Sequence, residues 1–344
     1  MSNIKQRKKD HVDLTVGGDM NYKRDTGFAH YDFVHNALPE VDIDKVSTEA
    51  SFLGRTYSFP LFISSMTGGY IDGTAVNAVL AEFCEAYNLP FGVGSQRVML
   101  EDESTIESFS IVREKAPTAF IASNIGGAQL IDGLSKENRE LLVQSIRADA
   151  IIVHLNPLQE LMQPEGDRNF KGIEDGIRQL KEESNLPIFV KETGAGISGA
   201  VAERLLQNNV DVIDIAGAGG TSWSKVENRR PSNQNPDTMF DEWGIPTAEA
   251  LEQVVQLKNE YEFSVIASGG IRSSFDIAKA FCLGADFCAA AGPIIKAVDQ
   301  GGYEGLESLV QRWKRQLKII MTLLGCNCLD DLIPGHVRMK SKRS

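Results

Sequence analysis

The chain has 344 residues, 42% of them hydrophobic, and a formal net charge of −12. This length and apolar content suit one large folded unit, and the negative charge argues against a nucleic-acid partner, because phosphate backbones would be repelled. The cysteines are scattered without metal-ligand spacing and no apolar run is long enough to cross a membrane, so we expect no zinc site, no membrane span and a reduced, cytoplasmic protein.

Residues 1–13 are strongly basic within this acidic chain and include Arg7, Lys8 and His11. They predict either a solvated, frayed terminus or an arm that folds over a binding site and clamps a polyanion. Residues 14–58 contain short mixed segments, which indicate a lead-in to a larger domain with a small hairpin near its end.

Short apolar runs alternate with segments of helical spacing from residue 61 onward. The predicted strands lie at 61–66, 91–94, 119–123, 150–155, 187–190, 212–215, 263–267 and 286–291. The predicted helices lie at 74–87, 106–115, 136–146, 172–184, 198–208, 247–261, 274–283 and 304–324, with a polar loop at 222–243. Eight such repeats predict an α/β fold, a single-domain TIM (β/α)8 barrel with an N-terminal extension. We expect the arm and lead-in at 1–58, the barrel at 59–330 and a basic tail at 331–344.

Active sites of such barrels lie where the strands end. The residues at the predicted strand ends that we weigh for function are Met66, Thr67, Ser95, Arg97, Asn124, His154, Asn156, Lys191, Thr221 and Arg272. Gly269 and Gly270 follow the seventh strand and precede a helix, a pattern whose backbone N–H groups can cradle a phosphate. A glycine pair also marks an ordinary turn, but its position in the repeats favours the phosphate site.

Four of the charged or polar side chains admit two interpretations each. Lys191 forms a structural pair with Glu192 or another carboxylate, or it acts on a ligand, as a Schiff base or as the counter-charge of an anionic cofactor. His154 is a core histidine or a site residue, and Arg97 is a loop salt bridge or a phosphate partner. Glu160 is an exposed acid or a ligand of Mg²⁺ that also meets a diphosphate.

The basic arm, the arginine after the second strand and the candidate magnesium carboxylate together suggest a substrate with more than one phosphate. The glycine pair would then hold a different phosphate, that of a cofactor. Small residues at Ser65 and at 216–218 leave room for a flat ring over the barrel mouth, and flavin mononucleotide (FMN) fits both demands.

The chain resembles the type 2, flavin-dependent isopentenyl-diphosphate isomerases over nearly its whole length. The motifs that carry the resemblance are Arg7-Lys8-Lys9-Asp10-His11, Ser65-Met66-Thr67-Gly68-Gly69, Gly94-Ser95-Gln96-Arg97, Asn124-Ile125-Gly126, His154-Leu155-Asn156, Gln159-Glu160, Lys191-Glu192, Gly217-Ala218-Gly219-Gly220-Thr221-Ser222-Trp223 and Asp241-Glu242-Trp243-Gly244-Ile245-Pro246-Thr247. The resemblance implies FMN that is active when reduced, Mg²⁺, NADPH or NADH as reductant, and interconversion of isopentenyl and dimethylallyl diphosphate. It also implies a homo-oligomer, a tetramer or an octamer.

The resemblance further implies roles for individual residues. Those implied to bind the substrate are Arg7, Lys8, His11, Ser95, Gln96, Arg97, Asn156 and Gln159. Those implied to hold FMN are Ser65, Met66, Thr67, Ser95, Asn124, Lys191, Thr221, Gly269, Gly270, Arg272, Ala291 and Gly292. Glu160 is the implied Mg²⁺ ligand, and Gln159, Lys191 and His154 are the implied catalytic residues. The chain departs from the family pattern at Ala216, where serine is frequent, and at Gly292, where arginine is.

Our mechanistic hypothesis is a 1,3-proton shift beside a reduced flavin, with Lys191 stabilising the anionic ring and Gln159 and Glu227 relaying a proton. An FMN-dependent 2-hydroxy-acid oxidase is the alternative enzyme, but it needs a catalytic histidine near the C-terminal loops, and no histidine lies between His154 and His336. A non-catalytic flavin-binding barrel is the second alternative, and the many polar strand ends argue against it.

Overall fold

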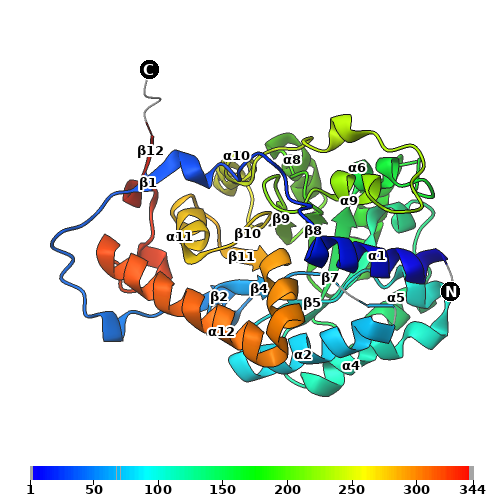
Figure 1. The fold of residues 1–344 in the computed structure, drawn as a ribbon, viewed down its shortest axis with the longest axis horizontal. Helices are drawn as coiled ribbons and strands as arrows, with labels where there is room; N and C mark the ends of the chain where they lie inside the picture. The colour runs from blue at the N-terminus through cyan, green and yellow to red at the C-terminus, as the bar shows by residue number, and fades with distance from the viewer. Residues whose placement is uncertain (1–2, 67, 70, 341–344) are drawn as a thin grey trace.

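The computed structural model describes residues 3–66, 68, 69 and 71–340, and its centre is a closed barrel of parallel strands (Figure 1). Around the barrel the strands follow the order β10-β11-β4-β5-β6-β7-β8-β9, and β9 pairs with β10 to close it. Their bounds are β4 Leu61–Ile63, β5 Phe91–Gly92, β6 Ile121–Gly126, β7 Ala150–Leu155, β8 Ile188–Glu192, β9 Val212–Asp214, β10 Ser264–Ala267 and β11 Phe287–Ala290. The predicted TIM barrel is confirmed.

Aromatic rings fill the end of the barrel at which the strands begin. Phe52 stacks on Phe287 with ring centroids 4.9 Å apart and meets Phe189 edge-on at 5.9 Å. Phe52 belongs to an antiparallel hairpin of β2, Ala50–Phe52, and β3, Arg55–Tyr57, which confirms the predicted hairpin. Because these rings are buried there, the barrel opens only at the opposite end, where the strands finish.

The outer helices are those expected from the apolar periodicity, with shifted ends. Their bounds are α2 Ile71–Tyr87, α4 Glu107–Lys115, α5 Lys136–Gln144, α7 Ile173–Glu183, α8 Gly199–Gln207, α10 Thr247–Val255, α11 Ser274–Cys282 and α12 Gly292–Leu324. The last helix begins at Gly292 rather than at residue 304. Gly301 and Gly302 interrupt it with non-helical dihedral angles, which is why the sequence indicates a helix only beyond them.

Three short helices on the strand-end loops were not predicted: α3 Arg97–Glu101, α6 Pro157–Met162 and α9 Trp223–Asn228. Each is too short for a helical period to appear in the sequence. Local capping starts two of them: Pro157 occupies the first turn of α6, and Ser222 accepts the N–H of Lys225 at 3.2 Å at the start of α9. The predicted polar loop at 222–243 therefore contains a helix.

Single turns of 3₁₀ helix complete the connections: η1 Phe28–His30, η2 Ile43–Lys45, η3 Glu103–Thr105, η4 Gly127–Leu130, η5 Thr238–Phe240, η6 Gln256–Asn259, η7 Leu329–Asp331 and η8 Pro334–His336. Part of the expected tail, β12 Val337–Met339, pairs antiparallel with β1 Tyr31–Phe33 in the middle of the lead-in. None of the described helices is long and apolar enough to serve as a membrane span.

The N-terminal segment forms helix α1, Asn3–Gly17, drawn in dark blue in Figure 1. It packs against α9 and α12, and its side chains His11, Val12 and Thr15 line the cavity at the open end of the barrel. Of the two readings of the basic N-terminus, the structure therefore agrees with the arm that covers a site.

Candidate active site

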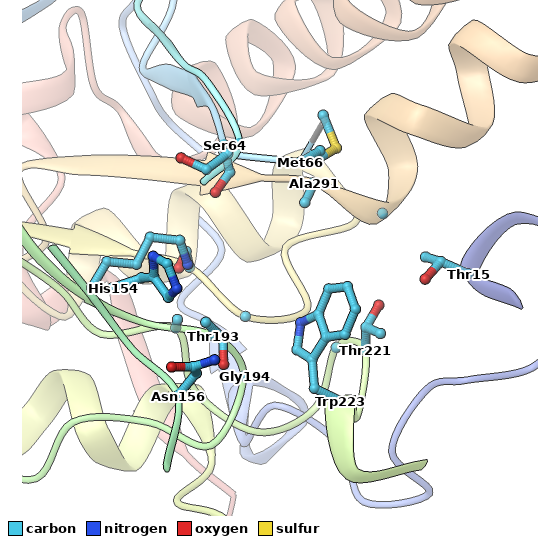
Figure 2. A pocket seen from close by; sticks show the side chains of 18 of the residues that line it. Thr15, Ser64, Met66, His154, Asn156, Thr193, Gly194, Thr221, Trp223 and Ala291 are labelled. Atoms are coloured by element: carbon cyan, nitrogen blue, oxygen red, sulfur yellow. The ribbon is translucent and has the colours of Figure 1, made fainter. Parts of the chain in front are cut away.

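A cavity of about 270 Å³ lies at the open end of the barrel, between the strand ends and α1 (Figure 2). It gathers most of the residues that the sequence analysis singled out. Those that line it are His11, Ser65, Met66, Ser95, Arg97, Asn124, His154, Asn156, Gln159, Glu160, Lys191, Thr221, Gly269, Gly270, Arg272, Ala291 and Gly292.

Four of the predicted site residues do not appear in this wall. Gln96 is fully buried and its amide is engaged by the protein: Nε2 donates to the carbonyl of Leu142 at 3.1 Å, and Oε1 accepts the N–H of Asn124 at 3.0 Å. The Gln96 side chain thus bonds to β6 rather than facing the cavity, and its role in binding substrate stays a prediction. Thr67 lies outside the described residues, and Arg7 and Lys8 belong to α1 with side chains that are not described.

Lys191, the residue before the last of β8, lies at the base of the cavity. Its ammonium group donates to the carbonyl of Glu192 at 2.6 Å and lies 3.9 Å from Asp214 Oδ2. Asp214 also accepts a hydrogen bond from the hydroxyl of Ser268, and burial raises the pKa of this aspartate. The carboxylate near Lys191 is thus Asp214, and the pair presents a cation to the cavity with its counter-charge buried behind it.

The Glu192 side chain points away from Lys191 and into the loop that follows. Its carboxylate accepts the backbone N–H groups of Gly194, Ala195 and Gly196. Burial raises the pKa of Glu192, and these hydrogen bonds and the charge of Lys191 act in the opposite direction. Glu192 therefore shapes the loop beside the cavity, and the suggested structural pair of Lys191 with its neighbour's carboxylate does not form.

His154, near the end of β7, faces the cavity (Figure 2). Its Nδ1 lies 2.8 Å from Oδ1 of Asn124, which belongs to the neighbouring strand β6. The imidazole is thereby held in one orientation by a residue whose backbone N–H is bonded to Gln96. Of its two readings, the core histidine is disfavoured because the ring lines the cavity.

Glu160 lies on α6 with both carboxylate oxygens already hydrogen-bonded. Oε1 accepts from Nδ2 of Asn156 at 2.8 Å, and Oε2 accepts the N–H of Asp167 at 2.8 Å. Arg97 approaches the same region and pairs with Asp167 at 3.1 Å and with Glu101 at 3.0 Å. Within the described residues no cluster of three acids, histidines or cysteines could hold a metal, so Glu160 offers a cation one carboxylate and not a complete cage.

Glu227, on α9, connects α1 with α6. Its Oε1 lies 2.7 Å from Nε2 of His11 and accepts from Nε2 of Gln159 at 3.1 Å, and its Oε2 accepts from Arg230 at 2.8 Å. Burial alone would raise the pKa of Glu227, but the hydrogen bonds from His11, Arg230 and Gln159 outweigh it and lower the pKa to about 2. This carboxylate is therefore ionised at neutral pH. The edge of the Trp223 ring meets His11, with centroids 5.1 Å apart.

The part of the cavity lined by Ser65, Gly269 and Gly292 suits a planar ligand that carries a phosphate. Ser65 Oγ is buried and has no hydrogen-bond partner within the described part of the chain, so it is poised for a ligand. A Cβ added at Gly292 would meet only Thr221 Oγ1, at 3.9 Å, so the start of α12 faces open space. The N–H groups at such a helix start favour an anion. Gly269 adopts a φ of +94°, and a Cβ there would lie 2.1 Å from the carbonyl of Gly217.

The sequence analysis missed several residues of the site. Asp214 and Ser268 lie behind Lys191, and Thr15 and Asn21 reach the cavity from the N-terminal segment. An aspartate inside an apolar strand was the available signal for Asp214, because a buried charge needs a partner. The other three carry no such signal in the sequence.

Comparison with known proteins places the chain among flavin enzymes. The family of FMN-dependent dehydrogenases matches residues 128–339. A protein of Chlorobium luteolum named isopentenyl-diphosphate delta-isomerase is 45% identical, with 93% of this chain and 92% of that protein covered. One of the same name from Rickettsia peacockii is 39% identical, with 97% of each covered.

Solved structures share the fold at low identity. A flavocytochrome b2 variant with sulfite bound has a TM-score of 0.71 at 17% identity, covering 97% of this chain and 84% of that one. A putative lactate oxidase of Pediococcus acidilactici has a TM-score of 0.71 at 14% identity, covering 99% and 95%. At such identities the likeness concerns the barrel alone.

Proposed function

The chain belongs to the FMN-dependent dehydrogenase family and, within it, to the type 2 isopentenyl-diphosphate delta-isomerases, and we propose that it interconverts isopentenyl diphosphate and dimethylallyl diphosphate. The observation that carries the proposal is the match to proteins of this name over nearly the whole chain. The polar residues gathered around one cavity support it, because a substrate with a charged diphosphate and an apolar tail needs both kinds of wall.

The cavity fits FMN, because it offers an unpartnered hydroxyl, a buried cation and an open helix start. Lys191, Asn124, Ser65 and Met66 would surround the ring. The residues that would hold the phosphate end are Thr221, Gly269, Gly270, Arg272, Ala291 and Gly292, and Thr67, outside the described residues, stays a prediction. When bound and reduced, FMN supplies an electron-rich ring that stabilises developing positive charge on the substrate without net oxidation, and NADPH or NADH is the proposed reductant.

The protein side of this chemistry begins with Lys191. Its ammonium group would stabilise negative charge on the ring, and Asp214, 3.9 Å from the ammonium group, would help to hold it in place. His154, fixed by Asn124, would orient the substrate's allylic end against the ring. The helices that cover the cavity exclude water, which would otherwise capture a cationic intermediate.

The diphosphate would bind at the α6 side of the cavity. Mg²⁺ commonly uses one or two carboxylates together with substrate phosphates and water, so Glu160 suffices as the protein ligand. Arg97 is 34% exposed along its side chain, and exchanging one of its surface ion pairs for a phosphate costs little. Ser95 and Asn156, with Arg7 and Lys8 from α1, complete the proposed set.

The second proton would move through Gln159 and Glu227. Glu227 is ionised at neutral pH, and its Oε1 already accepts hydrogen bonds from the His11 and Gln159 side chains that line the cavity. That oxygen is therefore placed to hold a proton in transit. Gln159 would orient the bond between the substrate and this acceptor.

The oxidase alternative has a specific observation in its favour, since solved structures that share this fold include a flavocytochrome b2 variant and a putative lactate oxidase. These two are 17% and 14% identical to this chain, and the likeness concerns the fold alone. Isomerase relatives at 39–45% identity outweigh them. A homo-oligomer, a tetramer or an octamer, and a cytoplasmic location stay predictions.

The test is turnover of isopentenyl diphosphate by protein loaded with FMN, before and after reduction. We expect dimethylallyl diphosphate only from the reduced protein. Glu160→Ala should lose Mg²⁺ stimulation and most turnover yet keep its yellow cofactor. Glu103→Ala, which changes an exposed acid in η3, should behave as the wild type. Oxidation of a 2-hydroxy acid without any isomerisation would instead support the oxidase.

A further inference from the structure

Arg230 lies just after α9, with its guanidinium enclosed by three acidic side chains. Its Nη1 donates to Glu227 Oε2 at 2.8 Å and its Nη2 donates to Glu165 Oε1 at 2.8 Å. Its Nε lies 4.0 Å from Asp10 Oδ2, and only 1% of the arginine side chain is exposed. A guanidinium this deeply buried needs such partners, because an unpaired charge in the interior is strongly destabilising.

The three acids come from separate parts of the chain. Asp10 belongs to α1, Glu165 to the segment after α6, and Glu227 to α9 itself. Arg230 therefore connects the helix that covers the cavity to two segments that form the rim of the cavity. The planar fork of an arginine can address two carboxylates at once, and a lysine cannot.

Glu227 extends this contact into the cavity. One of its oxygens accepts from Arg230, and the other is bonded to His11 and Gln159, both of which line the cavity. His11 follows Asp10 directly on α1. Two consecutive side chains of the covering helix thus meet the same buried arginine–glutamate pair.

We propose that Arg230 is a positioning residue that couples closure of α1 over the cavity to the orientation of Glu227 and Gln159. The contact with Glu165 fixes the guanidinium from the α6 side. When α1 closes, Asp10 docks beside Arg230 and His11 docks on Glu227. The catalytic consequence rests on the proposed isomerase function. The coupling itself concerns how tightly α1 is held, and it can be measured without turnover.

Limited proteolysis reports how often α1 leaves its site, because a protease cleaves the opened form. The trypsin sites in α1 are Lys5, Arg7, Lys8 and Lys9. In FMN-loaded protein, Arg230→Gln should raise the cleavage rate in α1 by about tenfold or more. Arg229→Gln is the matched control and should leave the rate unchanged, because Arg229 is 45% exposed and its nearest acid is Asp241, 3.9 Å away.

Steady-state kinetics provide a readout that a merely structural role would not move. Arg230→Gln should raise the KM for isopentenyl diphosphate and lower kcat, while FMN content and the absorbance spectrum stay those of the wild type. Arg230→Lys, which keeps the charge but loses the fork, should restore part of both parameters. Asp10→Asn removes the α1 contact alone, and it should speed cleavage of α1 even if Arg230→Gln does not fold.

The outcomes separate the coupling from the proposed function. Cleavage of α1 at the wild-type rate in Asp10→Asn, or in a folded Arg230→Gln, would overturn the coupling. If the variants show faster cleavage but the reduced wild type does not isomerise its substrate, the coupling stands and the proposed function fails.

Discussion

Glu227→Gln tests how much stability the buried carboxylate contributes. Burial would raise the pKa of Glu227, but hydrogen bonds from His11, Arg230 and Gln159 dominate and lower the pKa from 4.5 to about 2. This difference of about 2.5 pH units corresponds to roughly 3 kcal/mol of folding stability at neutral pH. The carboxylate is fully buried, so solvent screening does not reduce this value substantially.

The direction of the pH dependence follows from the lowered pKa. The folded protein binds the proton less readily than the unfolded chain does, so the stabilisation is complete above about pH 5.5 and is lost as the pH falls from 4.5 toward 2. By pH 3.5 about 1.4 kcal/mol of it should be gone.

Urea unfolding followed by tryptophan fluorescence measures this loss. Glutamine at position 227 does not titrate, and the other acids titrate alike in the wild type and the variant. Only Glu227 therefore makes the difference in stability between the two proteins depend on pH. The difference in the free energy of unfolding should shrink by about 1.4 kcal/mol between pH 7 and pH 3.5. A difference that stays constant over this range would refute the view that its neighbours hold the carboxylate ionised.

Three further predictions concern the cofactor end and the far side of the barrel. Ser65→Ala removes a hydroxyl that has no partner in the protein, so the FMN-free variant should be at least as stable in urea as the FMN-free wild type. It should bind FMN about fivefold more weakly in a fluorescence titration. Unchanged binding would exclude that hydroxyl as a contact to FMN. Gly269→Ala should abolish FMN binding, because the methyl group meets the backbone of the 217–219 loop. Gly292→Ala should fold normally and only lower FMN affinity. Equal stability of the two variants in a thermal melt would contradict this difference. Arg113→Met removes six hydrogen bonds to carbonyls and Asp149 below the barrel. It should cost about 3–5 kcal/mol in urea unfolding while the kcat of folded protein stays unchanged.

The fold could be predicted because each barrel strand is a short apolar run with clear limits. β7, predicted and found at Ala150–Leu155, lies between Asp149 and Asn156, which mark both ends. Helix ends were harder to predict wherever glycine interrupts the apolar periodicity, as at Gly301 and Gly302 inside α12. The two glycines break the helical geometry there, and the helix continues beyond them, packed against α2 and α11.

The rule that strand ends carry the site placed Lys191 and His154 correctly, because it depends only on the fold. It could not tell which way a side chain turns, and Gln96 turns into the protein although its neighbours face the cavity. It also could not choose between a frayed and a folded N-terminus. The folded arm depends on contacts such as that between His11 and Glu227, which are 216 positions apart in the sequence. Such a contact is visible only in the tertiary structure.

The pairing of β1 with β12 bears on how the molecule is made. The lead-in behind α1 finds this partner strand only after the strands and helices of the barrel, which lie between the two in the chain, have been synthesised. The barrel of a nascent chain can thus form before the segment that follows α1 pairs with β12. Deletion of residues 337–339 would then leave the lead-in without this partner strand.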